Sequence, residues 1–185
     1  GVQWGDEVQI LARRLPCAFA TAGEHLTQLI EELRPAMVIA TGLASGRSDI
    51  SIERVAINLN DARIPDNLGA QPIDTAVVSG GPAAYFTTLP IKAMVKAVRE
   101  VGIAASVSQT AGTFVCNQVF YQLQHTLAGS GIRSGFIHVP SLPEQVADSG
   151  QPSMALDTLV EGLQVAILTA WRTTVDVSET GGQVS

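Results

Sequence analysis

The sequence predicts a single α/β domain, residues 1–185, in which a mostly parallel, twisted sheet lies between two layers of helices. Short apolar runs rich in β-branched residues alternate with longer amphipathic runs of helical period. This order is typical of βα units and of a three-layer α/β/α sandwich. A length of 185 residues fits one domain, and a hydrophobic fraction of 46% with only 15% charged residues provides a sizeable core.

The helical runs carry start and stop signals. Residues 23–33 repeat Leu and Ile at helical spacing and are followed by Pro35. Residues 90–101 begin with a proline and end before Gly102. Two further helices are predicted at 116–127 and 153–173.

The predicted strands occupy residues 36–41, 52–59, 103–108 and 135–139. The first of these is apolar and ends at Gly42, as a buried parallel strand would. Residues 68–84 are rich in Gly, Pro and Asp and are predicted to form a loop. The polar residues 176–185 are predicted to form a frayed tail.

The charge balance excludes several classes of partner. The net charge is −6 and the pI about 4.9, with no cluster of Lys and Arg. This argues against nucleic acid and against an anionic membrane surface. No stretch has the ~18–20 apolar residues needed to cross a membrane, and the N-terminus lacks the pattern of a signal peptide. Two cysteines without metal-ligand spacing favour free thiols, so we expect a cytoplasmic protein.

Cys116 is the candidate nucleophile. It follows a predicted strand and a small-residue turn, in SQTAGTFVCNQVF, which places it at the start of a helix. Free N–H groups and the helix dipole favour a thiolate there, the dipole by at most about 2 kcal/mol. A thiol with a pKa near ~8.5 also needs a cationic neighbour to be mostly ionised at neutral pH. The alternative is a buried structural cysteine, which is the commoner role.

His138 and Glu53 are the candidate partners of this thiol. His138 ends the apolar run GFIHV, where an imidazole is either a satisfied core residue or a base. Glu53 opens the run ERVAINL, where a carboxylate is either an exposed charge or part of a site. Sites in open α/β sheets form beyond the carboxyl ends of the strands, where we expect these residues to converge. By themselves they are a weak Cys/His/carboxylate set.

Other residues have simpler interpretations. Cys17 follows a proline in a short apolar stretch, as a packed side chain would. Arg63 and Asp66 lie in a predicted turn, where an ordinary surface ion pair is expected. The loop TGLASGRSD, which contains Arg47, is the one candidate phosphate site, but it lacks a phosphate-binding signature.

Three long motifs resemble the pyroglutamyl-peptidase I family, also called pyrrolidone-carboxylate peptidases. GRSDISIERVAINLNDARIPDN is similar to the family's glutamate motif, SQTAGTFVCNQVFY to its cysteine motif and SGFIHVPSLPEQ to its histidine motif. The segment SGGPAAYFTTLPIK also matches, and the similarity runs from about Leu15 to SETGG near the end. The resemblance implies a cysteine exopeptidase that removes an N-terminal pyroglutamyl residue. It also implies a single α/β/α domain, assembled as a homotetramer, with no metal or organic cofactor.

The resemblance assigns the reacting groups by position. Cys116 falls on the family's nucleophile, His138 on its base and Glu53 on the acid that orients the imidazole. Arg63 falls on the arginine near the oxyanion. These roles imply a thioester acyl-enzyme.

The resemblance also assigns a substrate pocket. Ile64, Phe114 and Val115 fall on positions that line the pyroglutamyl pocket, and so does Cys17, as a wall and not as a reactive group. Apolar walls suit an uncharged lactam ring, whose N–H and C=O can pair with backbone groups. An unmodified N-terminal residue would bring an ammonium group into this apolar slot at a high cost.

The chain departs from the family pattern in two ways. Leu43 stands where many members have glutamine, so a side-chain hydrogen bond from that position is lost. The family's N-terminal strand and its Gly-Phe-x-Pro-Phe-Gly loop are absent from the 185 residues. We therefore expect the protein to carry an upstream segment on the order of 30 residues, one strand–loop–helix unit.

Two other functions compete with the peptidase. A nucleoside phosphorylase on a similar scaffold would need a phosphate site, for which only the Arg47 loop is a candidate. A non-catalytic binding protein derived from the peptidase is the second, favoured by the absent loop. Turnover of a pyroglutamyl-naphthylamide distinguishes all three.

Overall fold

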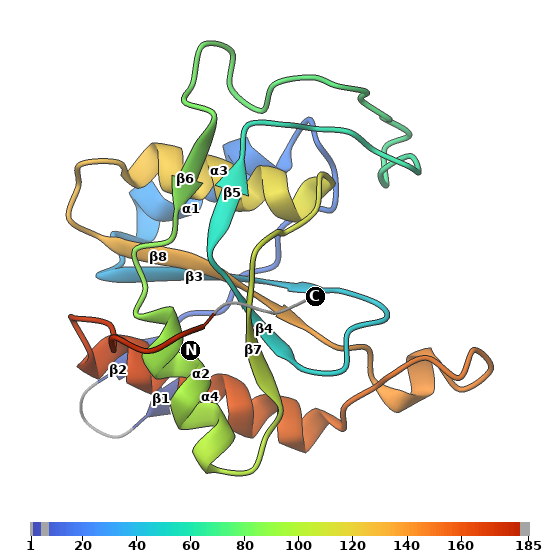
Figure 1. Cartoon of the computed structure of the whole chain (residues 1–185). Coiled ribbons are helices and arrows are strands. Elements are labelled where there is room, and N and C mark those ends of the chain that lie inside the picture. The colour runs from blue at the N-terminus through green and yellow to red at the C-terminus, as the bar shows by residue number, and fades with distance from the viewer. Residues whose placement is uncertain (1, 5–7, 182–185) are drawn as a thin grey trace.

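The central sheet has four strands in the order β3-β8-β4-β7 (Figure 1). The structure is a computed structural model that describes residues 2–4 and 8–181. The strands span Met37–Leu43 in β3, Arg133–Val139 in β8, Ile50–Glu53 in β4 and Ala105–Ser108 in β7. β3 runs parallel to β8 and β4 parallel to β7, whereas β4 runs antiparallel to β8. The predicted α/β class with a mostly parallel sheet is confirmed.

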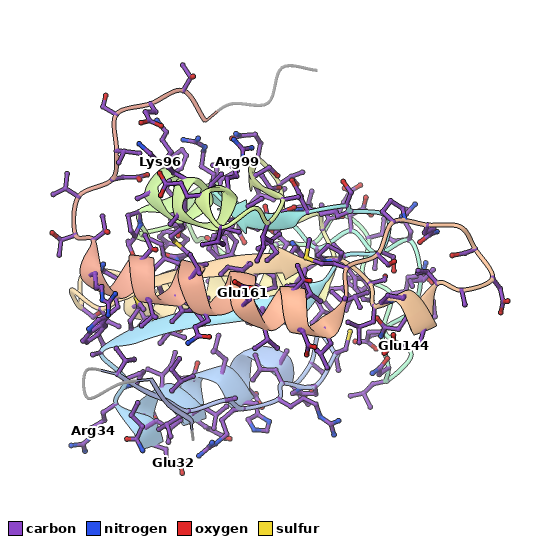
Figure 2. All side chains as sticks on the ribbon, turned by 90° about the horizontal axis from the view of Figure 1, so that it is seen from below. Glu32, Arg34, Lys96, Arg99, Glu144 and Glu161 are labelled. Carbon is purple, nitrogen blue, oxygen red and sulfur yellow. The ribbon has the colours of Figure 1, made fainter. Side chains whose placement is uncertain are left out.

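Helices cover both faces of this sheet, which makes three layers (Figure 1). α1 (Ala22–Leu33) and α3 (Val115–Leu127) share one apolar core with the sheet. α2 (Ile91–Glu100) and α4 (Leu156–Arg172) share a second core on the opposite face. Figure 2 shows Glu32, Lys96 and Glu161 on the helices, and all three are exposed. The amphipathic period read from the sequence therefore reports which face of each helix is buried.

The predicted strand at 52–59 is divided between two sheets. β4 ends at Glu53, and β5 (Val55–Ile57) pairs antiparallel with β6 (Ala84–Phe86) in a small sheet that packs against α3 (Figure 1). The buried side chain of Asn117 explains the division. It accepts from the N–H of Ile57 at 3.0 Å and donates to the carbonyls of Ile57 and Leu59 at 2.9 Å each. These bonds hold β5 on α3 and away from the line of β4.

Three short elements complete the chain. β1 (Val2–Trp4) and β2 (Val8–Ile10) form an antiparallel pair, and a 3₁₀ turn, η1, spans Pro143–Gln145. Among the described residues, no helix is long and apolar enough to span a membrane.

The segment after α4 is anchored to α2, a contact that its polar composition did not predict. The carboxylate of Asp176 accepts hydrogen bonds from the N–H groups of Lys92 at 3.1 Å and Ala93 at 2.9 Å. Lys96 forms an exposed ion pair with Glu179 at 3.1 Å. The rest of the predicted tail, residues 182–185, lies outside the described residues.

Candidate active site

The candidate site forms where β3, β8 and β4 lie side by side. His138 is the penultimate residue of β8, and its strand partners are Gly42 in β3 and Ser51 in β4. Glu53, the last residue of β4, pairs with Ser108 at the end of β7. The sequence predicts that carboxyl ends of parallel strands meet here. Glu53 instead reaches His138 because the short strand β4 runs antiparallel to β8.

Glu53 and His138 form a buried, charge-assisted hydrogen bond. Nδ1 of His138 donates to Oε1 of Glu53 at 2.7 Å, and the two residues are 3% and 0% exposed. The ring of Phe136 packs on the imidazole with centroids 4.8 Å apart. Because Nδ1 faces the carboxylate, Nε2 is the ring nitrogen available for proton transfer.

Arg47, in the loop between β3 and β4, contacts the same carboxylate oxygen. Its Nη1 donates to Oε1 of Glu53 at 2.7 Å, and its Nη2 donates to the carbonyl of Thr110 at 3.0 Å. The other oxygen of Glu53, Oε2, is buried and has no hydrogen-bond partner within the described part of the chain. The carboxylate is thus held through one oxygen by two donors.

Cys116 lies in the first turn of α3, and its thiol faces β3. A Cβ atom added to Gly42 would lie 2.9 Å from Sγ of Cys116 and 2.9 Å from Cζ of Phe136. Only glycine leaves room for the thiol at this position. Since Gly42 is also the strand partner of His138, the thiol lies against the strand pair that carries the histidine.

Burial is the largest influence on the Cys116 thiol. It raises the pKa from 9.0 to about 11, with further upward contributions from Cys17 and Glu53 and a downward one from Arg47. In the folded chain, desolvation of the anion therefore outweighs the stabilisation that the helix start offers the thiolate. A pKa raised in this direction favours the protonated thiol at neutral pH.

Several of the predicted pocket residues gather near this thiol. Cys17 lies close enough to act on its charge. Phe114, the residue that precedes α3, packs edge-on against Phe19 with ring centroids 5.2 Å apart. Val115 is buried in the same core. The segment before α1 and the start of α3 therefore form one apolar wall beside Cys116.

Asp66 fixes one side of this wall. It accepts hydrogen bonds from the N–H groups of Phe19 at 2.7 Å, Leu68 at 2.8 Å and Ala70 at 2.9 Å. The sequence predicts a surface ion pair between Arg63 and Asp66. Asp66 is instead 7% exposed, and its carboxylate is taken up by backbone N–H groups.

Arg63 and Ile64 lie on an exposed loop beside the start of α3. The N–H of Asp61 donates to the carbonyl of Thr113 at 3.0 Å, and the Thr113 hydroxyl donates to the carbonyl of Asp61 at 2.7 Å. Arg63 is exposed and Ile64 is 63% exposed. Leu43, the last residue of β3, is 47% exposed. The structure places the loop next to the site and leaves these three side chains open to solvent.

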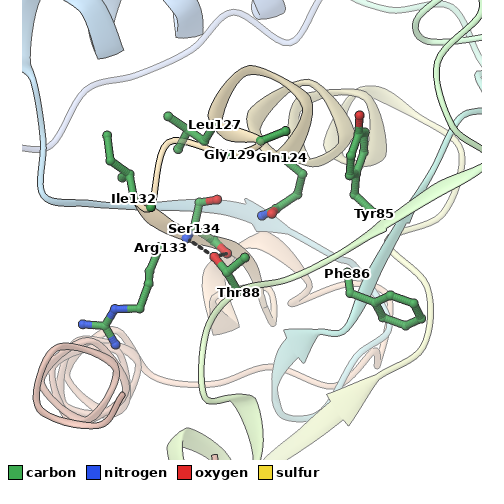
Figure 3. Close-up of a pocket in the computed structure, with 11 residues that line it drawn as sticks. Tyr85, Phe86, Thr88, Gln124, Leu127, Gly129, Ile132, Arg133 and Ser134 are labelled. Atoms are coloured by element: carbon green, nitrogen blue, oxygen red, sulfur yellow. Dashed lines mark hydrogen bonds between the residues drawn. The ribbon is translucent and has the colours of Figure 1, made fainter. Parts of the chain in front are cut away.

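A cavity of about 200 Å³ lies at the opposite end of β8 (Figure 3). Within it, the N–H of Ser134 donates to Oγ1 of Thr88 at 2.7 Å. None of the residues predicted for the site lines this cavity; its walls include Tyr85, Phe86, Gln124 and Arg133. Over residues 2–4 and 8–181, no three His, Cys, Asp or Glu side chains are grouped to hold a metal ion.

Gly42, Arg47 and Asp66 contribute to the site although their sequence context predicts no role there. Gly42 was noted only as the end of a strand, and Arg47 only as a possible phosphate contact. The usable signal for Arg47 is its position six residues before Glu53, at the entry to the same strand. Its partner depends on how the loop folds back, which local sequence does not encode.

Comparison with known proteins gives a consistent result. The family model described as pyroglutamyl peptidase matches residues 2–173. The chain belongs to the pyroglutamyl peptidase family. A pyrrolidone-carboxylate peptidase of Pseudomonas fluorescens is 82% identical over 185 residues, covering 100% of this chain and 87% of that protein. A pyrrolidone-carboxylate peptidase of Cupriavidus taiwanensis is 61% identical over 188 residues, with the same two coverages, 100% and 87%.

Solved structures of pyroglutamyl peptidases share the fold. Pyroglutamyl peptidase I from Bacillus amyloliquefaciens has a TM-score of 0.88 at 45% identity, covering 90% of this chain and 80% of that one. A mutant pyrrolidone carboxyl peptidase from Pyrococcus furiosus has a TM-score of 0.89 at 45% identity, covering 93% and 86%. The resemblance read from the three motifs is confirmed, and the chain is a peptidase of this family.

Proposed function

We propose that this chain removes N-terminal pyroglutamyl residues from peptides, with Cys116 as nucleophile, His138 as general base and Glu53 as the acid that orients the imidazole. The observation that carries the proposal is the buried 2.7 Å contact between His138 and Glu53 beside the strand position that receives the Cys116 thiol. A nucleophile, a base and an orienting group in this order are the requirements for acyl transfer.

The first half of the reaction is attack by a neutral thiol. With a pKa of about 11, Cys116 must lose its proton as it attacks, and Nε2 of His138 accepts it. A bond forms between Sγ and the carbonyl carbon of pyroglutamate. The resulting oxyanion is stabilised by the first-turn N–H groups of α3, which have no partner inside the helix, together with Arg63.

The second half releases both products. His138 returns its proton to the leaving nitrogen as the C–N bond breaks, leaving a thioester on Cys116. The same imidazole then takes a proton from water, whose oxygen attacks the thioester carbon. As the C–S bond breaks, His138 returns this proton to Sγ, which frees pyroglutamate and restores both the thiol and the neutral imidazole. Glu53 stabilises the imidazolium during both steps.

The pocket is proposed to recognise an uncharged ring. Phe114 and Val115, with Cys17 on the facing segment and Ile64 on the neighbouring loop, supply apolar surface for the ring methylenes. A free N-terminal ammonium would be desolvated there without a partner, which selects for the cyclised residue.

Turnover of a pyroglutamyl-naphthylamide tests the proposal. We expect Cys116→Ser and His138→Ala each to reduce kcat by at least about 10³-fold, because each removes a reacting group. Glu53→Gln should cost less, since it disturbs orientation and not the reacting atoms. Circular dichroism establishes that each variant is folded. His125→Ala serves as a control because this histidine lies in the last turn of α3, at the opposite end of the helix from Cys116, with its Nδ1 2.8 Å from the Tyr85 hydroxyl.

Wild-type turnover in the Cys116→Ser or His138→Ala variant would reject the assignment. Phosphate-dependent cleavage of a nucleoside, with no release of naphthylamine, would favour the phosphorylase instead.

A further inference from the structure

The guanidinium of Arg47 joins two parts of the site that the proposed triad leaves unconnected. Through Nη1 it bonds to Oε1 of Glu53 at 2.7 Å, and through Nη2 to the carbonyl of Thr110 at 3.0 Å. Thr110 belongs to the segment between β7 and α3, which leads into the helix that carries Cys116. One side chain therefore links the acid to the backbone that positions the nucleophile.

The hydrogen bonds to the Glu53 carboxylate are also unevenly divided between its two oxygens. Oε1 accepts from both Arg47 and His138, whereas Oε2 is buried and unpartnered within the described residues. A single hydrogen bond to Oε1 leaves that oxygen free to swing as the side chain rotates, whereas a second donor on the same oxygen fixes where it lies. With Arg47 present, Oε1 lies between two donors and the position of the imidazole is defined. Without Arg47, rotation of the carboxylate would change the direction in which Nε2 points.

The charge of Arg47 also supports a role in holding Glu53. Glu53 is 0% exposed, and removing one partner of a buried charge pair leaves the other uncompensated. The Arg47 side chain is 26% exposed, so the guanidinium keeps partial contact with water while it neutralises the carboxylate. Both of its described donations are used inside the site, which also argues against the phosphate role considered for this loop.

We propose that Arg47 is a positioning residue for catalysis: it fixes the Glu53 carboxylate against His138 and holds the loop of Thr110 at a set distance from both. This inference rests on the proposed function, in which Glu53 orients the base. Arg47 would join Cys116, His138 and Glu53 as a fourth residue of the site, acting through Glu53 and not by contact with the substrate.

Kinetics of Arg47→Gln and Arg47→Lys variants test the inference. We expect Arg47→Gln to lower kcat by about 10- to 100-fold, part of the contribution that acid–base catalysis makes, with KM changed less than about threefold. Arg47→Lys keeps the charge and one hydrogen bond, so its loss should be smaller. Lys96→Gln is the control: it breaks an exposed ion pair, in which Nζ of Lys96 lies 3.1 Å from Oε1 of Glu179. Its kcat should stay within about twofold of wild type.

A double-mutant cycle separates positioning from general structural damage. If Arg47 acts through Glu53, then adding Arg47→Gln to Glu53→Gln should lower kcat by less than about twofold beyond Glu53→Gln alone. Independent effects that multiply would overturn the inference, even if both single variants are impaired. Arg47→Lys provides the comparison if Arg47→Gln fails to fold.

Alkylation of Cys116 gives a second readout that a structural role would not move. The groups acting on its charge are Cys17, Glu53 and Arg47, and of these only Arg47 favours the thiolate. Arg47→Gln should therefore slow iodoacetamide labelling of Cys116 at a fixed pH while labelling of Cys17 is unchanged, as peptide mapping would show. Unchanged kinetics and labelling in Arg47→Gln would refute the inference, whereas activity in Cys116→Ser would refute the proposed function beneath it.

Discussion

At the scale of single residues, the room for the Cys116 thiol depends on one missing methyl group. The backbone of Gly42 passes so close that a Cβ there would meet both Sγ of Cys116 and the ring of Phe136 at 2.9 Å. Phe136 is 2% exposed and cannot move aside easily, so the thiol is the group that would shift. A displacement of the proposed nucleophile would affect reaction geometry more strongly than packing.

Gly42→Ala is therefore expected to impair catalysis more than folding. Displacing the thiol by part of an ångström should lower kcat by about 10- to 100-fold, while overpacking costs about 1–3 kcal/mol of stability. Steady-state kinetics and urea unfolding measure the two effects. Gly162→Ala is the matched control, because its Cβ would also meet a core atom, Cδ1 of Ile50, in the core on the face of the sheet opposite α3. Equal losses of kcat in the two variants would contradict the prediction.

At the scale of elements, the start of α2 is completed by a residue far along the chain. Its N-cap position is Pro90, which offers no side-chain hydrogen bond. Asp176 instead accepts from the N–H groups of Lys92 and Ala93, and its carboxylate lies at the positive end of the helix dipole. The segment after α4 thereby ties α2 to the rest of its layer.

Asp176→Ala should lower the free energy of unfolding by about 1 kcal/mol, the usual cost of losing a helix cap. For a domain of this size that corresponds to a fall in Tm of about 2–4 °C. Thermal and urea unfolding followed by circular dichroism would measure it, with Glu179→Gln in the same segment as an exposed control. A Tm equal to that of wild type would show that the segment does not stabilise α2.

At the scale of the whole molecule, burial of the Cys116 thiol couples stability to pH. The pKa is about 11 in the folded chain against a value of 9.0 for the exposed group. The folded state therefore holds this proton where the unfolded state has released it. The contribution of the protonated thiol to the free energy of unfolding is therefore present in full below pH 9.0 and is lost as the pH rises to about 11.

We expect stability to fall through this range by an amount that depends on Cys116. A difference of about two pKa units corresponds to about 2–3 kcal/mol. Urea unfolding at a series of alkaline pH values should show a shallower decline for Cys116→Ser than for wild type. Cys17→Ser serves as the comparison variant in the same series. Cys17 is exposed, and its partial burial also raises the pKa of its thiol. Identical pH profiles for wild type and Cys116→Ser would show that the thiol is not held neutral by the fold.

The sequence alone determined the order of the four helices and of the strands in the central sheet, because these follow from signals within a few residues. Apolar period, Pro35 and Gly102 placed three helices within a few residues of α1, α2 and α3. The same local signals put Cys116 at a helix start and His138 near a strand end, and the motifs around them identified the family.

Only the tertiary structure decided how these residues meet. The run at 52–59 looks like one strand, yet side-chain bonds from Asn117, some 60 positions away, divide it into two. The antiparallel direction of β4, the bond between Arg47 and Glu53 and the burial of Asp66 also depend on how the loops fold back. The high pKa of Cys116 has the same origin. A helix start favours a thiolate, but desolvation, which only packing creates, has the larger effect.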